Sequence, residues 1–244
     1  MKISIITPCF NSEKTIRNTL DSVEDQEVNE IEHILIDGGS TDGTIRILNE
    51  YAQRVSYDVK IISEPDDGIY DAMNKGVRMA AGELVGIINS DDWYESETVK
   101  RVSGVYDGTD SEIIYGAIRV YEGERIRSIE FYHHDFLMQR MINHPGCFVS
   151  RGVYERVGLF DTTYRSSADY DWMKRAYDSG AEFVPVYDVL ANIRTGGMSS
   201  SNVGFRETLK LQYQWGQVSA PRYAVYTIKS YVGDMLRKLV GKNR

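Results

Sequence analysis

The stretch GELVGIINSDDW, residues 82 to 93, leads from an apolar run straight into two adjacent aspartates and a tryptophan. The apolar run has the length of a buried strand. Asp91 and Asp92 repel each other, and burial raises the cost of keeping both of them ionised. The pair therefore needs a cation or hydrogen-bond donors, unless it only caps a solvated turn. The rest of the sequence decides between these two interpretations.

Strand-like and helix-like patterns alternate through the first half of the chain. Apolar runs are followed by residues at helical spacing, such as Ile16, Leu20 and Val23 behind a cap at Asn11 or Ser12. This alternation predicts parallel strands joined by helices that cover both faces of one sheet. The expected strands are residues 2–8, 31–39, 58–65 and 83–92, each followed by a helix, the third of which covers residues 68–82.

The second half of the chain has a different pattern. Its sequence indicates an antiparallel hairpin over residues 112–132 with a turn at Glu122-Gly123, a short helix over 134–142, and a helix over 168–180. From Pro221 onward, Val225, Ile228, Val232 and Met235 recur at helical spacing, and lysines and arginines occupy other faces or the tail. Such a basic amphipathic helix can lie on an anionic membrane surface, or it can dock on the core or on a second subunit.

The composition is that of an ordinary soluble protein, with 244 residues of which 42% are hydrophobic and 26% charged. The formal net charge of −8 disfavours non-specific binding to nucleic acid, because no basic surplus neutralises phosphates. Cys9 and Cys147 lack the spacing of a zinc site and favour a reducing, cytoplasmic setting. Neither a signal-peptide pattern nor a run of about 18 apolar residues is present, so we expect no membrane span.

Acidic residues follow the predicted strands at the point where each strand ends. In an alternating α/β sheet, ligands bind outside the carboxyl ends of the strands. Carboxylates that gather there suit a hard divalent cation such as Mg²⁺ or Mn²⁺. Because no glycine-rich phosphate loop follows the first strand, such a metal would have to bridge the diphosphate oxygens of a nucleotide. The strand-end residues are Thr7-Pro8, Asp37-Gly38-Gly39, Glu64 to Asp67, and Asp91-Asp92.

Five motifs with a fixed order connect these strand ends to the second half. They are ITPCFN (6–11), IDGGSTDGT (36–44), EPDDGIYDAMNKGV (64–77), GELVGIINSDDW (82–93) and ADYDWMKRA (168–176). Together they resemble glycosyltransferase family 2, whose members have the α/β GT-A fold, a Rossmann-like and mostly parallel sheet flanked by helices. The family transfers a sugar from a nucleotide-diphosphate donor with inversion. The resemblance covers about residues 1–200 and is closest over the first half.

The resemblance implies roles for residues around the nucleotide. Asp37 matches the acid that accepts a hydrogen bond from the base, and Thr7 and Pro8 match the strand end that lines the same pocket. Asp67 and Asn74 fall in the segment that frames the donor.

The resemblance also implies a metal site at the aspartate pair. Asp92 matches the metal ligand, and Asp91 matches the residue that meets the ribose or the donor sugar and shares in the metal site. The implied cofactor is Mg²⁺ or Mn²⁺, and the implied donor is a UDP-sugar.

Asp169 matches the general base, which removes the proton from the acceptor hydroxyl. Family members often have Glu-Asp at this place, whereas this chain has Ala168-Asp169, with Asp171 two residues further on. Two residues at this spacing do not share a helix face, so at most one aspartate points at the acceptor. We favour Asp169 over Asp171. The helix dipole, which favours acids in a first turn, would explain either residue without catalysis.

Two further residues are candidates for contacts with the acceptor or with a loop. His144 precedes Pro145 and an apolar run and can line the acceptor pocket. Arg194 precedes the loop TGGMSSSN (195–202), which resembles the family loop that closes over the diphosphate, although an ordinary connection explains it equally well. The neighbouring His133 and His134 cannot place both rings on one face, which argues against a metal site there.

The sequence thus predicts a metal-dependent, inverting hexosyltransferase. It is expected to add one sugar at a time, because LQYQW (211–215) lacks the arginine of the Gln-x-x-Arg-Trp element found in processive members. The resemblance suggests a saccharide or lipid-linked acceptor in bacterial surface polysaccharide biosynthesis, with the protein cytoplasmic or peripheral on the inner face of the cell membrane. The alternatives are an enzyme like a sugar nucleotidyltransferase and a non-catalytic carbohydrate- or metal-binding module.

We expect residues 1–220 to form one GT-A catalytic domain. Residues 1–107 would bind the nucleotide-sugar, and residues 108–220 would form the acceptor side and add a small antiparallel extension to the sheet. Residues 221–244 would form the basic amphipathic helix.

Overall fold

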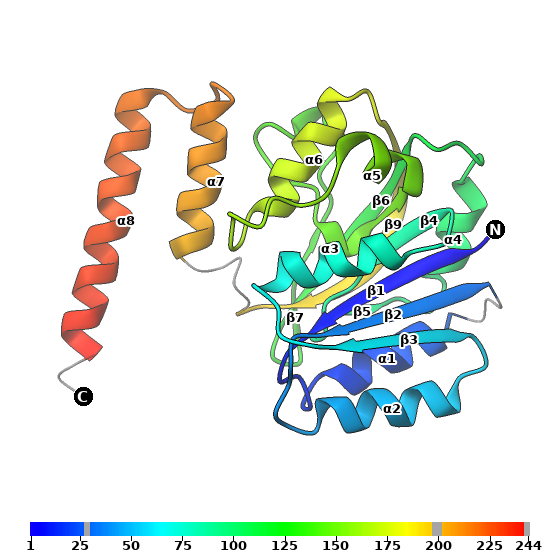
Figure 1. Cartoon of the computed structure of the whole chain (residues 1–244). Coiled ribbons are helices and arrows are strands. Elements are labelled where there is room, and N and C mark those ends of the chain that lie inside the picture. Colours follow the sequence, from blue (N-terminus) through cyan, green and yellow to red (C-terminus); the bar gives the residue numbers. More distant parts are fainter. Residues whose placement is uncertain (27–29, 197–201, 242–244) are drawn as a thin grey trace.

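The computed structural model describes residues 1–26, 30–196 and 202–241. Within these residues a nine-stranded sheet is flanked by helices on both faces (Figure 1). The strands are β1 (Ile3–Cys9), β2 (Ile31–Asp37), β3 (Asp58–Ser63), β4 (Leu84–Ile87), β5 (Trp93–Tyr94), β6 (Glu112–Glu122), β7 (Arg125–Glu130), β8 (Cys147–Ser150) and β9 (Glu182–Arg194). The helices are α1 (Ile16–Glu24), α2 (Thr44–Arg54), α3 (Ile69–Met79), α4 (Thr98–Val105), α5 (Arg151–Val157), α6 (Ala168–Asp178), α7 (Asn202–Gln214) and α8 (Ala220–Gly241), with 3-10 helices η1 (His134–Phe136) and η2 (His144–Gly146).

The strand order is β3-β2-β1-β4-β8-β6-β9-β5, and β7 pairs with β6. β1 runs parallel to both β2 and β4, and β2 runs parallel to β3. β8 is antiparallel to β4 and β6, whereas β9 is parallel to β6. The mostly parallel sheet with an antiparallel extension is therefore confirmed. The chain moves to one side of β1 with β2 and to the other side with β4, and ligands of such sheets bind at this switch point.

β1 and β2 are buried along their whole length because helices cover both faces of the sheet. Ile34 and Ile36 pack with α3, whereas Leu35 between them packs with α1 and α2, as the pleat of a strand requires. α3 approaches β1 closely at Gly76, where a β-carbon would lie 2.4 Å from the side chain of Ile6. This close packing holds α3 against β1.

The second half partly follows the predicted pattern. The hairpin of β6 and β7 turns where the sequence indicated, with Gly123 at a φ of 61°. The predicted short helix over 134–142 is wrong, since only η1 and turns form there. The Tyr170 hydroxyl donates to the Leu137 carbonyl at 2.7 Å and occupies an acceptor that a continuing α-helix would use.

α7 and α8 form a helical hairpin at one side of the sheet (Figure 1). Arg206 of α7 forms an ion pair of 2.6 Å with Asp234 of α8 and donates to Ser230 at 3.1 Å. The rings of Tyr213 and Tyr223 stack at 4.6 Å. Polar and aromatic groups thus hold α8 against α7. In the described part of the chain, no helix has both the length and the apolar content needed to cross a membrane.

Candidate active site

A cavity of about 530 Å³ opens at the carboxyl ends of β1 and β4. Strand ends of the first half line it together with η2, the start of α6 and part of α7. Six of the residues predicted from the sequence line it, namely Pro8, Asp91, Asp92, His144, Asp169 and Arg194. The switch point of the sheet and the second half of the chain therefore enclose one common space.

Asp92 is the buried member of the acid pair, with 4% of its surface exposed. Its Oδ2 accepts a hydrogen bond from the Asn89 side chain at 3.1 Å, and its Oδ1 accepts one from the Arg194 backbone N–H at 3.2 Å. Burial, and after it the charge of Asp91, raises the pKa of Asp92 to about 7. Without a cation, the carboxylate form of Asp92 is therefore costly near neutral pH.

The surroundings of Asp92 suit a hard divalent cation. The side-chain oxygen Oδ1 of Asn89 is buried and has no hydrogen-bond partner among the residues that the structure describes. Together with the carboxylates of Asp91 and Asp92, it provides the oxygen ligands that Mg²⁺ and Mn²⁺ prefer. A bound cation would also offset the burial cost that raises the pKa of Asp92. The residues present therefore fit the implied metal.

Arg194 connects the end of β9 to the acid pair. Its guanidinium donates to the backbone carbonyl of Asp91 and, at 2.8 Å, to the side chain of Asn18 on α1. The same group lies 4.4 Å from the centre of the Trp93 ring, which is a cation–π distance. Arg194 thus fixes the turn that presents the acids. Residues 197–201, most of the predicted closing loop, lie outside the described residues.

Asp169 lies at the start of α6 and is 8% exposed. Its Oδ1 accepts hydrogen bonds from the Tyr70 hydroxyl and from the Tyr170 N–H, both at 2.9 Å. Its Oδ2 lies 3.0 Å from Nδ1 of His144. Groups from α3, α6 and η2 therefore orient this carboxylate at the wall of the cavity.

Asp171 has a different environment. Its carboxylate forms an ion pair of 2.9 Å with Arg175, four residues further along α6. Arg175 also donates to the carbonyl groups of Val157 and Leu159, both at 2.8 Å. Asp171 does not line the cavity. Its contacts thus tie α6 to the segment that follows α5.

Asp37 and Thr7, both predicted to bind the nucleotide, are fully buried and do not line the cavity. The hydroxyl of Thr7 lies 2.9 Å from Nε2 of His33, whose Nδ1 is 2.8 Å from the Tyr51 hydroxyl. Burial lowers the pKa of His33 to about 3, so the ring is neutral at pH 7. These contacts link β1, β2 and α2 beneath the strand ends.

Asn74 and Asp67 are also outside the cavity wall. Asn74 is buried and exchanges two hydrogen bonds of 2.9 Å with the backbone of Phe160, which ties α3 to the second half. Asp67 is exposed, and its N–H donates to Asp71 at 3.3 Å. The structure therefore brings neither side chain to the acid pair.

Three residues that were not predicted individually contribute to the site. Asp66 lines the cavity, Asn89 contacts Asp92, and Tyr70 donates to Asp169. All three lie within the motifs that carry the family resemblance, and Asp66 was among the strand-end acids. What the sequence could not indicate is which member of Asp66-Asp67 faces the cavity, because that depends on the turn after β3.

A doubly wound sheet with an acid pair at its switch point, facing a further carboxylate across a cavity, defines a protein of the GT-A class. The model of the family "Glycosyl transferase family 2" matches residues 4–163. The chain belongs to this family, and the protein is a glycosyltransferase. This membership sets aside the two alternatives, a nucleotidyltransferase-like enzyme and a non-catalytic binding module.

Relatives and solved structures agree with this membership. A PGL/p-HBAD biosynthesis glycosyltransferase of Mycobacterium bovis is 29% identical over 93% of this chain and 96% of its own length. An uncharacterised glycosyltransferase of Mycobacterium tuberculosis is 32% identical over 81% of this chain and 77% of its own length.

Two solved structures share the fold. S. aureus TarS 1-349 in complex with UDP-GlcNAc superposes with a TM-score of 0.71 at 23% identity, over 87% of this chain and 65% of the TarS chain. The mannosyltransferase PcManGT of Pyrobaculum calidifontis, in complex with GDP-Man and Mn²⁺, has a TM-score of 0.68 at 19% identity, over 94% of this chain and 69% of its own.

Proposed function

We propose that this enzyme transfers one sugar from a nucleoside-diphosphate sugar, a UDP-sugar by preference, to a hydroxyl group of the acceptor, with inversion and with Mg²⁺ or Mn²⁺ as cofactor. The observation that carries the proposal is the shared cavity, in which the buried acid Asp92 and the carboxylate of Asp169 occur together. The solved neighbours with UDP-GlcNAc and with GDP-Man and Mn²⁺ support the donor class and the metal.

Each group has a defined task in this reaction. Asp92 and Asp91, with Asn89, would hold the cation, which when bound neutralises the negative charge of the departing diphosphate. Arg194 keeps the acid pair in place. Asp169, oriented by Tyr70 and His144, accepts the proton from the acceptor hydroxyl as its oxygen attacks the anomeric carbon.

The acceptor side follows from the division of the chain. We propose that residues 1–107 bind the donor and residues 108–220 shape the acceptor pocket, where η2 and the start of α6 line the cavity. The acceptor is a lipid-linked saccharide from which the surface polysaccharide grows. The enzyme adds one sugar each time it binds an acceptor.

A lipid-linked acceptor places the enzyme at the inner face of the cell membrane. α8 supports this location, because Val225, Ile228, Val232 and Met235 are exposed although its polar side contacts α7. From Ala220 to the end, the sequence has six basic residues and one acid, Asp234, which is paired with Arg206. We propose that α8 lies on an anionic bilayer surface, as the amphipathic helix predicted for residues 221–244, of which 242–244 lie outside the described residues.

Titration calorimetry with and without Mn²⁺ tests the metal and the donor together. We expect Mn²⁺ to increase the affinity of the chain for UDP by tenfold or more, which is the size of one contact between charged groups. Asp92→Asn should abolish this increase, because the variant loses the charge that holds the metal. The control Asp67→Asn keeps it, because Asp67 is outside the cavity. An affinity for UDP that is independent of metal would refute the assignment of the acid pair. A screen of nucleotide-sugars for donor hydrolysis then identifies the sugar.

A further inference from the structure

Asp37, which the family resemblance assigns to the nucleotide base, has protein partners at both carboxylate oxygens, although Oδ1 has only the Cys9 thiol, at 4.0 Å. Its Oδ2 accepts from the N–H groups of Gly39 and Ser40, at 3.1 and 3.0 Å, and from the Ser63 hydroxyl at 2.7 Å. The residue is fully buried and does not line the cavity. Asp37 therefore shapes the turn after β2 and does not face a ligand.

The carboxylate of Asp66 lies against the next residue of that turn. A β-carbon on Gly38 would lie 2.4 Å from Oδ2 of Asp66 and 3.0 Å from its Cγ. Only a glycine at position 38 leaves this space to the Asp66 side chain. The Gly38 N–H is bonded to the carbonyl of Cys9 at 2.9 Å, so Asp66 also lies close to the carboxyl end of β1.

Asp66 retains a free acceptor at the cavity. Its Oδ1 accepts from the Gly68 N–H at 2.9 Å, which sets the turn before α3. Its Oδ2 accepts no hydrogen bond from any residue in the described part of the chain. Asp66 is half-buried and lines the cavity together with Pro8 and Phe10. Asp66, with this free oxygen, thus belongs to the wall of the site.

The position suits one part of the donor. β1 separates β2, which ends just before Gly38, from β4, which leads to Asp92. The two strands lie about 10 Å apart at two strand spacings, so the two acids approach the end of β1 from its two sides. A nucleoside diphosphate that places its diphosphate at Asp92 reaches Asp66 with its base. Phe10, 60% exposed, offers an aromatic face on the same wall.

We propose that Asp66, and not Asp37, accepts the hydrogen bond from the ring N–H of the donor's base, and that Gly38 makes room for it. An ionised carboxylate only accepts hydrogen bonds. It therefore selects uracil, with N3–H, or guanine, with N1–H, and rejects adenine and cytosine, which present an unprotonated ring nitrogen at the corresponding edge. The inference rests on the proposed function, since it requires a nucleoside-diphosphate donor.

The test compares nucleotides that differ in this one N–H. Calorimetry in Mn²⁺ measures UDP against N3-methyl-UDP, and GDP against N1-methyl-GDP. We expect the wild type to prefer one unmethylated nucleotide over its methylated form by about ten- to a hundredfold, the range for a hydrogen bond to a charged group. Asp66→Ala should remove this preference and leave the affinity for the methylated nucleotide unchanged, which also shows that the cavity is intact. The control Asp67→Ala keeps the preference.

A second variant tests the role of Gly38. Gly38→Ala displaces the carboxylate of Asp66 and should reduce the preference as Asp66→Ala does, and the double variant should lose no more than Asp66→Ala alone. A preference that survives in Asp66→Ala, or tighter binding of ADP or CDP than of UDP and GDP, overturns the inference and leaves the proposed function intact. Failure of every nucleoside diphosphate to bind overturns both.

Discussion

Asp169 and Asp171 show how local contacts separate two residues that the sequence cannot distinguish. Both lie in the first turn of α6, where the helix dipole favours acids. Asp169 receives two donors on Oδ1 and faces His144 with Oδ2 at the cavity, whereas Asp171 is paired with Arg175. Both residues have the same position in the first turn of the helix. They differ in their partners, because Asp169 contacts Tyr70 and His144, which lie outside α6 and line the cavity.

We expect Asp169→Asn to lower the rate of transfer by about 10²- to 10⁴-fold, the usual contribution of a general base. Affinity for UDP in Mn²⁺ should stay within twofold, because Asp169 is not among the residues proposed to hold the nucleotide or the metal. The matched control Asp171→Asn should keep most of the transfer rate, since its partner Arg175 retains its contacts with two carbonyl groups. If Asp171→Asn lost most of the transfer rate while Asp169→Asn stayed active, Asp171 and not Asp169 would be the general base. Steady-state kinetics on both variants decide the matter.

At the level of residues, the sequence predicted which strand ends carry acids but not which acids face the cavity. Asp91, Asp92 and Asp169 line it, while Asp37 and Asp67 do not. The reason is local. The pattern of apolar residues along a strand predicts which of its residues are buried, but the conformation of the turn after the strand determines where the next side chains point. Gly38 has no β-carbon, so the Asp66 side chain can lie against it. The hydrophobic periodicity of the sequence does not indicate this contact.

At the level of elements, β9 is the strand that connects the second half to the acid pair. It runs parallel to β6 from Glu182 to Arg194, and near its end its other edge pairs with β5, which begins directly after Asp92. Its last residue, Arg194, contacts Asp91, Asp92 and Trp93. The first-half elements β1 to β4 were predicted from hydrophobic runs, but the two residues of β5 are too few for such a pattern. The positions of β8 and β9 in the sheet depend on pairing with distant strands.

We expect Arg194→Ala to lower the Mn²⁺-dependent affinity for UDP by about tenfold, because the turn that carries the acids loses charge-assisted hydrogen bonds. Arg194→Lys should restore little of it, since an ammonium group cannot bridge the Asp91 carbonyl and Asn18 as the guanidinium does. Arg125→Ala, on the exposed strand β7, is the matched control and should leave the affinity unchanged. An unchanged affinity in Arg194→Ala would show that the turn holds its shape without this contact. The measurement is calorimetry with and without Mn²⁺.

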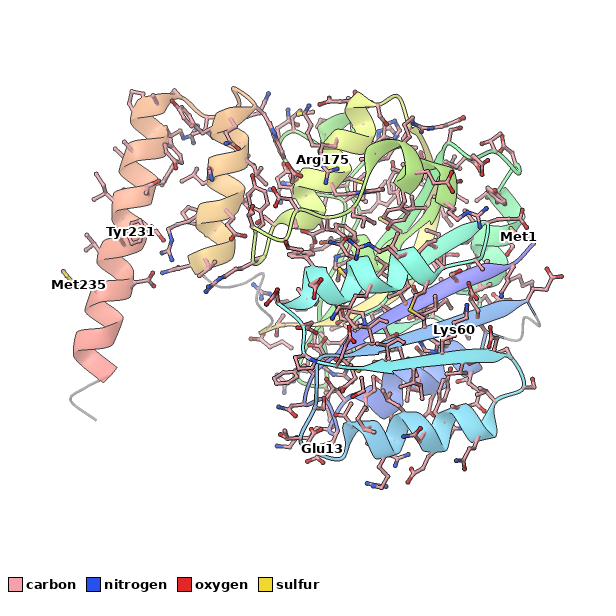
Figure 2. All side chains as sticks on the ribbon, in the orientation of Figure 1. Met1, Glu13, Lys60, Arg175, Tyr231 and Met235 are labelled. Atoms are coloured by element: carbon pink, nitrogen blue, oxygen red, sulfur yellow. The ribbon has the colours of Figure 1, made fainter. Side chains whose placement is uncertain are left out.

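At the level of the whole molecule, α8 of the helical hairpin exposes several apolar residues, whereas Leu209 and Leu211 of α7 are buried. Polar and aromatic groups hold α8 to α7, while Val225, Ile228 and Met235 are exposed, and Figure 2 shows Met235 pointing away from the rest of the molecule. The periodicity from Pro221 predicted the helix, but it could not predict that the polar side would be the packed one. That arrangement depends on Arg206 and its two partners on α8.

We expect the full chain to sediment with vesicles that contain an anionic lipid and to stay in solution with vesicles of phosphatidylcholine alone. Replacing Ile228 and Met235 together by aspartate should reduce the bound fraction severalfold, because both side chains leave water on binding. Ile129→Asp, on exposed β7, is the control and should bind like the wild type. Equal sedimentation of all three chains would exclude this surface, and a dimer that dissociates in the double variant would point to a second copy.

The hydrogen bond from Tyr70 to Asp169 joins residues 99 positions apart and crosses from one half of the chain to the other. This contact limits which halves of two family members can be combined in one active enzyme. If family members acquire new acceptors by recombination of their second halves, the incoming half brings its own aspartate but takes the hydroxyl at position 70 from the resident half. A chimera joined near residue 107 should therefore be active only where the resident half carries a tyrosine at that position.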